Sequence, residues 1–87
     1  MRVGVTEIGP EGSISRRAVD TWQLTDPDRW ETLIEQVLAS PPPYRAELGS
    51  SIYVIHSGDH AVLVGERDLT GPLHALVRMI LAGDNPA

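Results

Sequence analysis

The sequence predicts a small α+β domain with a two-layer ββαββα arrangement, in which a four-stranded, largely antiparallel sheet carries two helices on one face. Three observations predict it. Two pairs of short apolar-rich segments each surround a glycine-containing turn, as β-hairpins do. Each pair is followed by apolar residues at helical spacing. The 87 residues suffice for one domain with a small core. We expect that domain over residues 1–83 and a frayed tail over 84–87.

The first hairpin is expected to pair a strand from Arg2 to Ile8 with a strand from Ile14 to Trp22. Val3 and Val5 fall on one face of the first strand, because side chains alternate along a strand. The turn Gly9-Pro10-Glu11-Gly12 is a strong turn signal, and Gly12 is free to adopt a positive φ. The arginines and Asp20 of the second strand indicate that much of this hairpin is solvated.

The first helix is expected to begin at Asp26-Pro27, with Asp26 accepting N–H groups as the N-cap. Its apolar residues recur at the spacing of one buried stripe; they are Trp30, Leu33, Ile34, Val37 and Leu38. Three consecutive prolines, Pro41 to Pro43, end the helix near Ser40. Residues 41–50 then form a connector.

The second hairpin is expected to pair Ile52–His56 with His60–Gly65 around the turn Ser57-Gly58-Asp59. A second helix begins at Thr70-Gly71-Pro72 and ends at Gly83. Its buried stripe consists of Leu73, Leu76, Val77 and Ile80.

Both faces of the second hairpin are apolar. In the first strand of this hairpin, Ile52 and Val54 point to one face and Tyr53 and Ile55 to the other. In the second strand, Val62 and Val64 alternate with Ala61 and Leu63, so both faces again carry apolar side chains. Strands of this kind are normally covered on both sides, yet two short helices cover one face of such a sheet. The other face must be shielded by the connector, by a second copy of the chain or by a protein partner. A second copy would form a dimer that buries Tyr53 and Ile55.

Composition and charge exclude several classes of function. The formal net charge of −5 argues against binding to the phosphate backbone of a nucleic acid. There is no cysteine, and hence no disulfide or thiolate metal site. No apolar run has the length of a signal peptide or a membrane-spanning helix. We therefore expect a cytoplasmic protein that binds neither nucleic acid nor membrane and needs no cofactor.

Candidate reactive groups are few. His56, His60 and Asp59 could form a metal site if the turn has three residues, but a shift of one residue in register would separate the histidines. His74 has no nucleophile or orienting acid that can be assigned to it. Glu31 and Glu35 fall on the solvated side of the first helix. We expect no catalytic residues and no resident metal.

The turn between the first two strands is the best candidate for a binding site. Its residues Gly9, Pro10, Glu11, Gly12 and Ser13 form a protruding loop that is stiffened by proline. A preorganised loop can enter a cleft without a large ordering cost. Glu11 offers oxygen ligands at the tip, and Ile14 beyond it is an apolar anchor.

The chain resembles the emfourin family, small bacterial inhibitors of thermolysin-like (M4) zinc metallopeptidases. The resemblance extends from Met1 to about residue 83. In the first half of the chain it depends on Met1-Arg2-Val3 before the turn and on Val19-Asp20-Thr21 followed by Leu24. In the second half it depends on the turn Ser57-Gly58-Asp59 and on Asp68-Leu69 before the helical segment from Pro72 to Leu81. The family's turn usually carries a large apolar residue between glycines, where this chain has Pro10-Glu11.

The resemblance implies inhibition by occlusion of the peptidase cleft. A loop oxygen, from Glu11 or a nearby carbonyl, would approach the zinc, while Ile14 or Val3 fills an apolar pocket. Two alternatives remain. One is a homodimeric or partner-binding module that uses an apolar sheet face. The other is an enzyme or enzyme subunit, which would need a convergent polar site.

Overall fold

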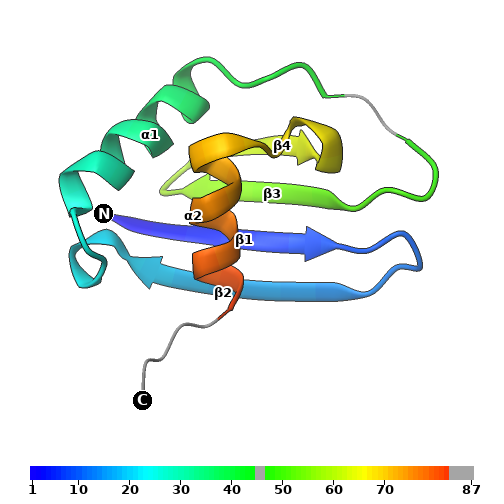
Figure 1. The fold of residues 1–87 in the computed structure, drawn as a ribbon, viewed down its shortest axis with the longest axis horizontal. Helices are drawn as coiled ribbons and strands as arrows, with labels where there is room; N and C mark the ends of the chain where they lie inside the picture. The colour runs from blue at the N-terminus through cyan, green and yellow to red at the C-terminus, as the bar shows by residue number, and fades with distance from the viewer. Residues whose placement is uncertain (45–46, 83–87) are drawn as a thin grey trace.

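The computed structural model describes residues 1–44 and 47–82 and has the expected ββαββα order (Figure 1). The strands are β1 (Arg2–Ile8), β2 (Ile14–Asp20), β3 (Ile52–Ser57) and β4 (His60–Gly65). The helices are α1 (Pro27–Ala39) and α2 (Gly71–Leu81), with short 3₁₀ turns η1 (Thr21–Gln23) and η2 (Glu66–Asp68). Neighbouring strands are antiparallel in the order β2-β1-β3-β4. The predicted fold class is confirmed; the expected helix stop at Gly83 and the tail lie outside the described residues.

The first hairpin ends two residues earlier than the sequence predicts. Thr21 is fully buried, its N–H donates to the carbonyl oxygen of Met1 at 2.8 Å, and its hydroxyl donates to Glu31. These contacts turn the chain out of β2 into η1 and leave Trp22 69% exposed. Glu31 was expected to be solvated, but its carboxylate accepts the hydrogen bond from Thr21 and so connects α1 to the end of the hairpin. Glu35 is exposed, as the sequence predicts.

Helix α1 begins and ends where the sequence predicts. Ser40 follows the last helical residue, directly before the proline run. The expected capping interaction is absent, however, because Asp26 adopts a left-handed conformation with φ of 55° and its side chain makes no capping hydrogen bond. Aspartate tolerates this conformation better than most residues, which is consistent with its place here.

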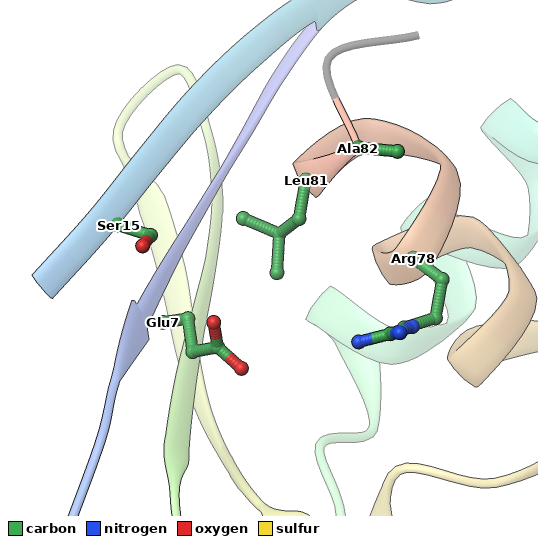
Figure 2. Close-up of a pocket in the computed structure, with 5 residues that line it drawn as sticks. All are labelled: Glu7, Ser15, Arg78, Leu81 and Ala82. Carbon is green, nitrogen blue, oxygen red and sulfur yellow. The ribbon is translucent and has the colours of Figure 1, made fainter.

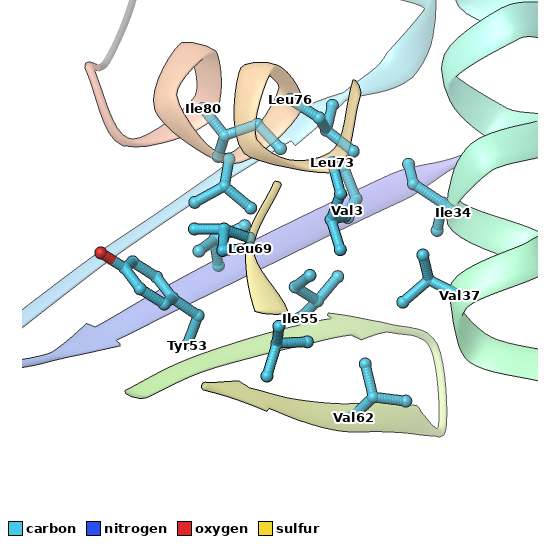
Figure 3. Packing of buried hydrophobic residues seen from close by; sticks show 13 residues of the cluster. Val3, Ile34, Val37, Tyr53, Ile55, Val62, Leu69, Leu73, Leu76 and Ile80 are labelled. Carbon is cyan, nitrogen blue, oxygen red and sulfur yellow. The ribbon is translucent and has the colours of Figure 1, made fainter. Parts of the chain in front are cut away.

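The core lies between the helices and one face of the sheet (Figure 3). Helix α2 packs across β1 and β2, and α1 lies beside β4. The sheet contributes Val3, Val5, Tyr53, Ile55, Val62 and Val64 to this core. All four α2 residues predicted to be buried are buried; of the α1 stripe, Ile34 and Val37 are buried and Trp30, Leu33 and Leu38 pack at the margin.

The opposite face of the sheet is uncovered within the described part of the chain. Cross-strand partners share a face, so the register assigns Thr6, Ile8, Ile14, Arg16, Ala18, Ile52, Val54, His56, Ala61 and Leu63 to this open face. Ile14 is 66% exposed and Leu63 is 45% exposed. Leu48 of the connector is fully exposed and does not shield them. The open face carries Ile52 and Val54, so a dimer that buries Tyr53 and Ile55 is not compatible with this fold.

Candidate functional site

The candidate binding residues lie together in the hairpin turn, with one exception. Gly9 to Ser13 connect β1 to β2 at the end of the sheet, and Ile14 is the first residue of β2. Val3 was expected to be an apolar anchor for a partner, and this expectation is wrong. Its side chain is fully buried in the core, because the alternation of β1 directs Val3 and Val5 toward the helices.

The turn is held in one shape by its own hydrogen bonds. The N–H of Gly9 donates to the carbonyl oxygen of Ser13 at 2.8 Å. The N–H of Gly12 donates to the carbonyl oxygen of Gly9 at 2.9 Å. The hydroxyl of Ser13 donates to the carboxylate of Glu11. A Cβ at Gly9 would overlap both of these side-chain groups. Glu11 therefore folds back over Gly9 and remains exposed at the tip.

The turn continues directly into the open face. Ile14 pairs with Ile8, and Ile8 pairs with Ile52 on the next strand. Val54 and Leu63 are partners on β3 and β4 and extend the apolar patch across the sheet. The turn 9–13 and the residues Ile8, Ile14, Ile52, Val54 and Leu63 thus form one continuous surface, which we call the contact surface.

The imidazole of His56 lies flat against the open face because its partner on β1 is a glycine. A Cβ on Gly4 would overlap the Cε1 and Nε2 atoms of His56. Glycine is normally unfavourable within a strand, so here it accommodates the ring.

We expect Gly4→Ala to lower the free energy of unfolding by about 1 kcal/mol, because the ring must be displaced. In a His56→Ala background the same change is expected to raise it by about 0.5–1 kcal/mol, since alanine is preferred to glycine in a strand. Urea denaturation of the four variants measures both effects. Equal effects in the two backgrounds would show that the ring and the glycine are not coupled.

The two histidines of the second hairpin do not form a metal site. Ser57 pairs with His60, so the turn has only two central residues, Gly58 and Asp59, and Gly58 has a φ of 59°. His56 therefore points to the open face and His60 to the helix face. His74 is exposed on α2. Among the described residues no group of three or more histidine or acidic side chains could hold a metal ion.

A shallow groove of about 380 Å³ lies on the other side of the sheet, between the end of α2 and the first hairpin (Figure 2). Glu7, Ser15, Arg78, Leu81 and Ala82 line it. The hydroxyl of Tyr53 donates to Glu7 Oε2 at 2.8 Å. Sequence reasoning missed this groove; the polar Glu7 at a core-facing position of β1 was the one available signal.

Burial raises the pKa of Tyr53 to about 12, and the hydrogen bond to Glu7 adds to the effect. The folded state thus disfavours the phenolate, whereas an unfolded chain ionises near pH 10. The contribution of the neutral Tyr53 phenol to the free energy of unfolding is fully present below about pH 10. It is lost as the pH rises from about 10 toward 12.

Tyr53→Phe is expected to reduce this decline in the urea midpoint between pH 9 and about 11.5. Tyr44→Phe is the matched control, because Tyr44 lies on the surface. An equal decline in the wild type and in Tyr53→Phe would contradict the assignment.

No helix in the described ranges is long and apolar enough to span a bilayer. No family model, curated protein or solved structure matches this chain.

Proposed function

We propose that this chain is a protein inhibitor of a thermolysin-like zinc metallopeptidase, acting by occlusion of the active-site cleft in the cytoplasm. One observation carries the proposal: a preorganised hairpin turn continues into an apolar sheet face that no described element covers. Exposed apolar patches rimmed by polar residues mark sites of protein binding. The resemblance to emfourins supplies the class of partner.

The turn suits the cleft in two respects. Such a cleft has an open coordination position on its zinc and an apolar pocket beside it. Glu11 has an exposed carboxylate at the tip, which in the free chain accepts a hydrogen bond from Ser13. Ile14 presents an aliphatic side chain directly after the turn. We assign the zinc-directed role to Glu11 and the pocket-filling role to Ile14. The chain itself would perform no chemistry and hold no cofactor.

A second candidate is a homodimer formed through the open face, favoured by the exposure of Ile14 and Leu63. The sheet has four strands of six or seven residues. At about 4.8 Å between strands and about 3.3 Å per residue its plane measures about 400 Å². A standard interface buries about 800 Å² per partner. A partner that also contacts the turn buries more area than a second copy that contacts the face alone.

The proposal is tested by titrating a thermolysin-like peptidase with the chain and measuring peptide hydrolysis. We expect activity to fall linearly to near zero at one equivalent when the enzyme concentration exceeds the inhibition constant. Glu11→Ala is expected to weaken inhibition by about tenfold, the size of a lost charge-assisted contact. Ser15→Ala, in the groove on the other face, is the control and should not change it.

Full activity at a tenfold excess of chain would overturn the proposal. Light scattering would then decide for the homodimer if it gave twice the monomer mass, and against it if the mass stayed that of one chain.

A further inference from the structure

Strand β2 forms an open edge of the sheet. It pairs with β1 alone, and its seven residues contain no proline, glycine or bulge. Five of the seven are exposed. A regular edge strand of this length is a template for a further strand, and proteins usually protect such edges.

The register shows which backbone groups are free to pair. At one end the N–H of Gly9 donates to Ser13, and at the other the N–H of Thr21 donates to Met1. Hydrogen-bonded pairs alternate with non-bonded pairs in an antiparallel ladder, so Ser15, Arg17 and Val19 carry the bonds to β1. The N–H and C=O groups of Ile14, Arg16, Ala18 and Asp20 therefore point away from the sheet.

Positive charge flanks this edge on both faces. Arg16 lies on the open face opposite Thr6, and Arg17 lies on the helix face opposite Val5. Arg78 of α2 lines the same groove as Ser15, but it lies across the groove from Ser15, with Glu7 and Leu81 between them (Figure 2). None of these arginines forms an ion pair with another described residue, although the chain carries a formal charge of −5. Glu7 is the carboxylate that lines the groove, and it accepts a hydrogen bond from Tyr53.

The charges also select the occupant. A second copy of β2 paired across a two-fold axis at the strand centre would place Arg17 directly opposite Arg17 of that copy, and like charges in that position destabilise a sheet. An extended segment rich in acidic residues would meet cations on both faces.

We propose that the free edge of β2 is a strand-addition site for an extended acidic segment of a partner protein. The outward groups of Arg16 and Ala18 pair with the segment's backbone. Its acidic side chains meet Arg16 on one face and Arg17 on the other. A small or apolar residue occupies the groove against Leu81 and Ala82. This edge is distinct from the contact surface, so the inference does not depend on the proposed peptidase.

A labelled ten-residue peptide in which pairs of glutamates are separated by single valines is the probe, because it presents acidic side chains on both faces of a strand. The same peptide with lysine in place of glutamate is its counterpart. We expect the acidic peptide to bind at least about tenfold more tightly at low salt, and salt to weaken it. On saturation the amides of Arg16 and Ala18 should become protected from hydrogen exchange, while that of Arg17, already bonded to β1, should not change.

Two variants separate the backbone from the charges. Ala18→Pro removes an outward N–H and leaves the ladder to β1 intact, because proline is tolerated where the N–H faces solvent. Arg16→Glu combined with Arg17→Glu reverses the charges and should weaken binding by about tenfold or more. Arg29→Glu, on the surface of α1, is the control for a single charge reversal away from this edge and should have less than about a twofold effect.

Any one of three results would overturn the proposal. The two peptides could bind with equal affinity, the double variant and the control could have equal effects, or hydrogen exchange at Ala18 could be unchanged on saturation. The exchange measurement uses the unaltered chain, so it decides the question even if Ala18→Pro does not fold.

Discussion

Truncation of Ile55 to alanine is expected to lower the free energy of unfolding by about 3–4 kcal/mol. Ile55 is fully buried on β3 (Figure 3). Its cross-strand partners are Val5 on β1 and Val62 on β4. Its removal leaves a cavity beneath the helices that a close-packed core cannot fill. A domain of this size is stable by only about 4–13 kcal/mol, so the variant is expected to be partly unfolded at 37 °C. Urea denaturation followed by circular dichroism measures the loss.

Ile14→Ala is the matched control, because it removes the same atoms from a side chain that is 66% exposed. We expect a cost below about 1 kcal/mol, set mainly by strand propensity. Similar losses at the two positions would contradict the assignment of faces, since a slip of one residue in register exchanges them.

Ile14→Asp is expected to weaken inhibition of a thermolysin-like peptidase at least about 100-fold, which corresponds to about 2.7 kcal/mol. Ile14 is the most exposed aliphatic residue of the contact surface and adjoins the turn. A carboxylate in an apolar pocket loses the hydrophobic contact and must be desolvated without a partner. Inhibition constants for the variant and the wild type test this directly.

Gln23→Asp adds the same charge at an exposed residue of η1, outside the contact surface, and is expected to change the inhibition constant less than about twofold. If the chain inhibits the peptidase and Ile14→Asp does so equally well, the assignment of Ile14 as the anchor is wrong.

Local patterns were sufficient for most of the fold. The proline run after Ser40 and the alternation of β1 and β4 each specify one element without reference to the rest of the chain. The stripe of α2 was predictable residue by residue for the same reason. The apolar character of both faces of the second hairpin predicted that the face without helices needs shielding, although which face that is depends on where the helices pack.

The remaining features depend on contacts between distant residues. Thr21 ends β2 early because it meets Met1 and Glu31, 20 and 10 residues away. The pairing of Tyr53 with Glu7 spans 46 residues. The histidines separate because the turn closes with two residues and not three. Val3 could have been placed correctly from the alternation it shares with Val5, which assigns it to the core.

The proposed function requires that the contact surface binds a protein partner. Methyl NMR of the chain during titration with an active-site-intact thermolysin-like peptidase tests this most directly. We expect broadening or shifts confined to the methyl groups of Ile8, Ile14, Ile52, Val54 and Leu63, with those of Ile55 and Leu76 in the core unchanged. The proposed role of the contact surface would be contradicted if the spectra did not change at a saturating excess of peptidase. It would also be contradicted if only residues of α1 and α2 changed.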